Sequence, residues 1–293
     1  MRITQSIMSR NLMTNLNINR ETMTELQNAA ANGKEVSKSS DDPVRFAKAS
    51  RFRKTLSQYD QYSRNINDGS GWVDNNALVM NEFHALIVDA RSIAIQGSDA
   101  SQSEETRQVL SDRVDDMIEE SVATLNSTYL GKSIFSGTDT QNMEPFEYDG
   151  SNITYTGNEG KMNRRISEGL DVEINITGSD IESTGVFTSL VALRDALAVN
   201  DDAGVADLLQ DLQDASDKVL SLDAQNGLVK GHMQMTSARL ETSKVNIQSF
   251  LSETEDADLA EVIMEYNGAE MAYEAALQVT SKALQLNIMD FLR

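Results

Sequence analysis

The stretch LAEVIMEYNGAEMAYEAALQVTSKALQLNIMDFLR, residues 259–293, decides the fold class. One set of its side chains recurs at alternating steps of four and three residues, interrupted only by Glu270 and Asn287. The set consists of Leu259, Ile263, Tyr266, Tyr273, Leu277, Thr280, Leu284 and Phe291. On a helix this spacing forms one narrow stripe, which is typical of a coiled-coil seam. The C-terminal segment is therefore predicted to be an amphipathic helix that needs a partner.

The N-terminal thirty residues repeat the arrangement. Their stripe consists of Leu12, Leu16, Met23, Leu26 and Ala30, with Asn19 completing the register. The two terminal helices could pair only with each other and complete a monomeric bundle. Such a pair covers each seam on one side only, and isolated long helices are weakly stable. We therefore favour contacts of both seams with neighbouring subunits.

Helical periodicity fills most of the chain between the two ends. Asp42 followed by Pro43 is a sound helix start, because the carboxylate accepts an orphan amide and proline gives up an N–H that had no partner. We expect this helix to be interrupted at residues 69–71, which read Gly-Ser-Gly, and a further helix to begin near Gly227.

Near residue 131 the pattern changes to short alternating runs. Phe146–Tyr148 and Ile153–Thr156 flank the turn residues 149–152, which predicts a β-hairpin. Further strands are predicted at 164–166 and 172–176. Because these strands are few and short, we expect the β segment to contribute little to the helical core and to be replaceable by a linker.

The sequence therefore predicts a mainly α fold: an elongated helical bundle with terminal coiled-coil helices and a small β insert at the chain midpoint. The predicted domains are the terminal coiled-coil helices at 1–42 and 256–293, the bundle at 43–136 and 186–255, and the β insert at 137–185.

Composition excludes several functions. The 25 Lys and Arg against 46 Asp and Glu give a net charge of −21, which argues against nucleic acid or an anionic membrane as a partner. The chain has no cysteine, and its two histidines, His84 and His232, lie on helical stretches without ligands at metal-binding spacing. No glycine-rich phosphate loop occurs. We expect no metal, no cofactor and no enzymatic activity.

One predicted helix carries a cluster of carboxylates that could in principle bind a metal ion. It consists of Asp115, Asp116, Glu119 and Glu120. Helical-bundle metal centres use a Glu with a His three residues later, and no Glu in this chain has one. The cluster is interpreted as a solvated helix face.

The N-terminus has neither a long apolar run nor a small-residue cleavage site, so it does not look like a secretory signal. No stretch approaches the length and apolarity of a transmembrane helix. The chain is therefore expected to be cytosolic, or to be exported without a cleaved signal.

Four short motifs carry a resemblance to the flagellin family, which covers nearly the whole chain. Ser40–Pro43 followed by residues 63–69, SRNINDG, resembles the family's N-terminal signature. Residues 255–260, EDADLA, and the closing DFLR at 290–293 resemble its C-terminal signature. Residues 129–138, YLGKSIFSGT, followed by a short β segment, are similar to the branch of the family that joins hook to filament.

The resemblance implies a structural subunit of the bacterial flagellum, a junction protein that joins hook to filament and polymerises through its terminal helices. It implies export through the flagellar apparatus to the outside of the cell, with the aid of a chaperone, and a homo-oligomeric ring. The ring's neighbours would be a further hook-associated protein and flagellin. The alternative is a flagellin-type filament subunit, and the short middle of the chain weakens that alternative.

Overall fold

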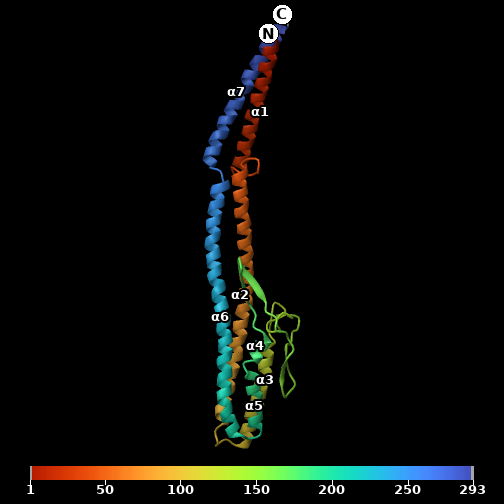
Figure 1. Cartoon of the computed structure of the whole chain (residues 1–293), viewed down its shortest axis with the longest axis vertical. Coiled ribbons are helices and arrows are strands. Elements are labelled where there is room, and N and C mark those ends of the chain that lie inside the picture. The colour runs from red at the N-terminus through yellow and green to blue at the C-terminus, as the bar shows by residue number, and fades with distance from the viewer. Residues whose placement is uncertain (1, 292–293) are drawn as a thin grey trace. The chain divides into compact units, whose positions relative to one another are not determined.

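Long helices dominate the computed structural model (Figure 1). It describes residues 2–291, and within them all side chains except those of residues 2–6, 8–9 and 283–291. The helices are α1 (Arg2–Asn32), α2 (Pro43–Gly97), α3 (Glu104–Leu125), α4 (Gly178–Glu182), α5 (Val186–Ala198), α6 (Asp202–Glu255) and α7 (Leu259–Phe291). The strands are β1 (Thr128–Tyr129), β2 (Lys132–Ser133), β3 (Phe146–Tyr148), β4 (Ile153–Tyr155), β5 (Asn163–Ser167) and β6 (Leu170–Glu173). The mainly α fold with small β elements in the middle of the chain is confirmed.

The chain forms two compact units. The first, the terminal unit, contains Met1–Gln58 and Ser243–Arg293, and the second, the central unit, contains Tyr59–Thr242. Helices α2 and α6 each contribute to both units. The domain boundaries drawn from the sequence stay a prediction.

In the terminal unit, a turn between α1 and α2 is closed at both ends by local chemistry. Gly33, with φ +67°, lies in the left-handed region that follows many helices, and its N–H donates to the Ala29 carbonyl at 2.9 Å. Asp42 accepts the amides of Val44 and Arg45 at 2.8 and 2.9 Å. The predicted helix start at Asp42 and Pro43 is therefore confirmed.

The predicted breaks in the long helices are wrong. Helix α2 continues through residues 69–71. Gly69 and Gly71 lie where neighbouring side chains pack closely against the helix: a Cβ on Gly71 would lie 2.3 Å from the Tyr129 hydroxyl. A Cβ on Gly69 would lie 2.8 Å from the Met233 methyl group. Helix α6 likewise runs through Gly227 without a break. A single helical glycine costs only about 1 kcal/mol, which packing on both sides can offset.

Three separate antiparallel hairpins make up the β structure in the described part of the chain. The predicted hairpin is confirmed as β3 with β4, in which Phe146 pairs with Tyr155 and Tyr148 with Ile153. Strand β5 covers the strand predicted at 164–166, whereas β6 ends at Glu173 rather than at residue 176. Helix α3 ends at Leu125, and the β1–β2 hairpin that follows was not predicted.

The β segment is part of the core of the central unit, so the expectation that it contributes little is wrong. Phe146 and Ile166 are 1% and 0% exposed and belong to the same apolar cluster as Phe83 and Phe187 of the helices. The Phe146 ring lies 5.5 Å from the Phe187 ring, centroid to centroid. The helices of this unit need the β segment to cover their apolar face.

Candidate assembly surfaces

Helices α1 and α7 lie side by side in the terminal unit (Figure 1). The less exposed side chains of α7 follow steps of four and three residues: Val262, Tyr266, Ala269, Tyr273, Ala276 and Thr280. Those of α1 follow the same rule at Leu12, Leu16, Asn19, Met23, Leu26 and Ala30. This spacing is typical of helices that pair along their length, and the coiled coil expected from the sequence stays a prediction.

The apolar surface of α7 is wider than one partner helix covers. Ile263, Leu277 and Val279 are 51%, 44% and 57% exposed, although all three are large apolar residues. Leu259, Met264 and Met271 are exposed as well. These six residues spread around the part of the helix that lies outside the stripe facing α1, and together they are called the outer face of α7. Exposed apolar residues gathered on one element often mark an interaction surface.

The residues predicted for the assembly seam thus divide between two faces. Leu12, Leu16, Met23, Leu26, Tyr266 and Tyr273 are half-buried in the described structure. Leu259, Ile263 and Leu277 are on the outer face of α7. The side chains of Leu284 and Phe291 lie outside the described residues. Steps of four and three residues can be drawn through either of two adjacent stripes of α7, because both stripes carry apolar residues. The spacing alone therefore does not tell which stripe faces α1.

The last residue of α6 is a buried acidic group that the sequence did not single out. The side chain of Glu255 is 4% exposed and receives Lys34 at 2.6 Å and Arg53. Its carbonyl accepts the amides of Glu35 and Val36 at 2.9 and 3.3 Å. Residues 33–36 are therefore tied to the end of α6. Only the position of Glu255 within the EDADLA motif could have drawn attention to it.

A second ion pair secures the same region. Arg45 bonds both carboxylate oxygens of Glu35, at 2.7 and 2.8 Å, and donates from Nε to the Thr254 carbonyl at 3.0 Å. The hydrogen bond from Arg45 lowers the pKa of Glu35 below its ordinary value. In the adjacent turn, amides of Lys38 and Ser37 lower the pKa of Asp41.

In the central unit, the SRNINDG motif holds a strand against α2. The Asn65 side chain donates to the Arg165 carbonyl at 2.7 Å. Asp68 accepts from Arg164 at 2.9 Å. The motif that carries the resemblance at the sequence level therefore positions β5.

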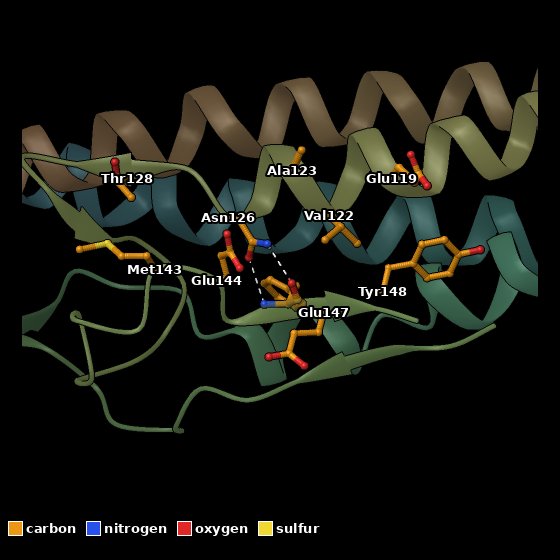
Figure 2. Close-up of a pocket in the computed structure, with 10 residues that line it drawn as sticks. Glu119, Val122, Ala123, Asn126, Thr128, Met143, Glu144, Glu147 and Tyr148 are labelled. Carbon is orange, nitrogen blue, oxygen red and sulfur yellow. Dashed lines mark hydrogen bonds between the residues drawn. The ribbon is translucent and has the colours of Figure 1, made fainter. Parts of the chain in front are cut away.

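An open groove of about 790 Å³ lies in the central unit between α3 and the segment that leads into β3 (Figure 2). It is lined by Glu119, Val122, Ala123, Asn126, Thr128, Met143, Glu144, Phe146, Glu147 and Tyr148. Asn126 fixes its base, because the side-chain amide accepts from the Phe146 N–H at 3.0 Å and donates to the Phe146 carbonyl at 2.8 Å. Asn126 thus bonds β3 as a neighbouring strand would.

At one end of the groove Tyr148 bonds Asp115 and Arg194. Burial and the hydrogen bond to Asp115 raise the pKa of Tyr148 to about 12, so the hydroxyl stays protonated. Of the predicted solvated face, Asp116, Glu119 and Glu120 are exposed, and Asp115 forms an ion pair with Arg194 at 3.2 Å.

The described residues include no group of three potential ligands that could hold a metal ion. His84 lies 3.0 Å from the Ser216 hydroxyl, and His232 is exposed. Among the described helices, none is long and apolar enough to span a lipid bilayer.

Two family models match the chain. The bacterial flagellin N-terminal helical region matches residues 3–140, and the bacterial flagellin C-terminal helical region matches residues 209–292. The chain belongs to the flagellin family. It is accordingly a structural component of the bacterial flagellum and not an enzyme.

Single proteins that resemble this chain are also flagellar proteins. A flagellin from Halalkalibacterium halodurans is 22% identical over 94% of this chain and 92% of its own length. The structure of FlgL from Bacillus cereus is 19% identical, with a TM-score of 0.60 over 69% of this chain and 98% of that one. The flagellar junction protein FlgL from Legionella pneumophila is 12% identical, with a TM-score of 0.59 over 73% of this chain and 100% of that one. At these identities the solved structures show a shared fold.

Proposed function

We propose that this chain is a junction subunit of the flagellum, which joins hook to filament and polymerises through its terminal helices. The observation that carries the proposal is the fold: chains described as FlgL, one of them titled a flagellar junction protein, match this chain over 98–100% of their length. The YLGKSIFSGT segment points in the same direction, since its resemblance is to the junction branch.

The terminal unit supports assembly through α1 and α7. Each helix has a narrow stripe directed at the other, and α7 also has its outer face of exposed apolar residues. A neighbouring subunit that covered this face would remove large apolar side chains from water at about 25 cal/mol per Å². On this proposal Leu284 and Phe291 continue the assembly surface toward the C-terminus.

The proposal includes partners and location. Copies of the chain form a ring, with a hook-associated protein on the hook side and flagellin on the filament side. The chain is exported with the aid of a chaperone and without a cleaved signal, and it functions outside the cell.

A filament subunit is the alternative function. It is favoured by the flagellin from Halalkalibacterium halodurans, which this chain matches over 92% of that protein's length.

Deletion of the gene separates the two functions. A junction subunit predicts that cells lose their filaments and release unassembled flagellin into the medium, because the filament then has nothing to attach to. Electron microscopy of the cells and immunoblotting of the medium measure both effects. A filament subunit predicts that the flagellin in the medium is not raised, and normal swimming would contradict both functions.

A further inference from the structure

The charge of this chain is distributed unevenly. The net charge is −21, yet between Asp42 and Asp60 the sequence carries Arg45, Lys48, Arg51, Arg53 and Lys54 and no acidic residue. Arg45 forms an ion pair with Glu35, and Arg53 forms one with Glu255. A basic segment in so acidic a protein calls for a partner of opposite charge.

The remaining cations of this segment share one side of α2. Lys48, Arg51 and Lys54 are exposed and follow one another at steps of three residues, so they are neighbours on the helix surface. Within the described residues, Arg51 and Lys54 form none of the ion pairs found. One turn before Lys48, Val44 is 78% exposed. Val44, Lys48, Arg51 and Lys54 are called the basic face of α2.

The groove of the central unit carries the opposite charge to the basic face of α2. Glu119, Glu144 and Glu147 line it and are exposed, and Val122 and Met143 give it apolar surface (Figure 2). Within the described residues, Glu144 and Glu147 form none of the ion pairs found. Three carboxylates beside apolar side chains suit a helix face that carries both cations and an apolar residue.

The basic face of α2 and the groove are also similar in length. Residues 44–54 span about 15 Å of helix at 1.5 Å per residue. Residues 143–148, which form one side of the groove, span about 17 Å as extended chain.

We propose that the groove between α3 and β3 binds the basic face of α2 of a second copy of this chain. The inference rests on the proposed role as a subunit that assembles with its own copies. Subunits with a charge of −21 repel one another at long range, and a local contact of opposite charge offsets this repulsion and selects one orientation of approach. The contact weakens with salt because both faces are exposed.

Disulfide cross-linking between two singly substituted chains tests the contact, since the natural chain has no cysteine. Val44→Cys and a tagged Met143→Cys are produced together in a strain that lacks the natural gene. Flagella are then isolated and oxidised. The control replaces Met143→Cys with Val199→Cys, which is 74% exposed and does not line the groove. We expect about tenfold more heterodimer from the first pair than from the control pair.

A charge exchange provides the second readout. Lys48→Glu, Arg51→Glu and Lys54→Glu together should lower the heterodimer yield about tenfold. Adding Glu119→Lys, Glu144→Lys and Glu147→Lys to the partner chain should restore it. Both variants change exposed residues, so circular dichroism of each purified chain should remain that of the natural one.

The outcomes separate the inference from the proposed function. If both cysteine variants are present in flagella and the heterodimer does not exceed the control, the groove contact is wrong while the junction role stands. If the natural chain itself is missing from flagella, the proposed function fails and the inference fails with it.

Discussion

At the scale of single residues, Glu255 is the group on which the link between residues 33–36 and the end of α6 depends. It is buried, and its partners Lys34 and Arg53 are partly exposed. When the carboxylate is removed, two cations lose their partner, and a lost buried pair costs more than a surface pair. The backbone bonds from Glu35 and Val36 to the same residue should weaken together with it.

We predict that Glu255→Gln speeds amide hydrogen exchange at Glu35 and Val36 about 10- to 100-fold, which corresponds to about 1.4–2.7 kcal/mol of local stability. Hydrogen exchange followed by mass spectrometry or NMR measures it. Glu253→Gln is the control, because that side chain is exposed. Equal exchange in the two variants would show that the ion pairs at Glu255 do not hold this link.

At the scale of elements, the β segment closes the core of the central unit. Phe146 is its clearest contribution, since its ring packs on Tyr155 at 5.2 Å and on Phe187 at 5.5 Å between ring centroids. Phe146→Ala should lower the free energy of unfolding by about 3–5 kcal/mol through the lost contacts and the cavity left behind. Urea denaturation of the full chain measures this. Met143→Ala, at an exposed position three residues away, should cost well under half as much.

A variant in which residues 140–183 are replaced by a flexible linker should also melt well below the natural chain. Retention of the natural melting temperature would restore the original expectation of a dispensable insert.

The elements also show what the sequence could and could not reveal. The hairpin of β3 and β4 was predictable because alternating residues flank an Asp-Gly turn, a strictly local signal. The continuity of α2 was not, because Gly69 and Gly71 look like helix breakers until the neighbouring Met233 and Tyr129 are placed. The burial of Phe146 was likewise hidden, since a three-residue strand carries too little pattern to reveal its partners. The groove depends on Asn126 bonding a residue twenty positions away.

At the scale of the whole molecule, the sequence indicated that both chain ends are amphipathic helices that need a partner, because the 4-3 spacing extends over many turns. It did not determine which stripe of α7 faces α1, since Tyr266 and Tyr273 fit both the observed seam and the predicted one. Because the stripe that contains Tyr266 and Tyr273 faces α1, Ile263 and Leu277 remain on the outer face of α7. We propose that a neighbouring subunit covers that face.

Incorporation of Ile263→Asp into flagella tests this central claim most directly. Ile263 is 51% exposed, so the free chain should fold and melt like the natural one, whereas a carboxylate buried between subunits costs several kcal/mol in every copy. The control is Val199→Asp, which makes the same kind of change at an exposed apolar residue outside α7. Both variants are produced in the deletion strain, and the amount of each in isolated flagella is compared with the amount secreted. We expect Ile263→Asp to be secreted but absent from flagella while Val199→Asp is incorporated normally, and equal incorporation of the two variants would contradict the assignment of this face to a neighbouring subunit.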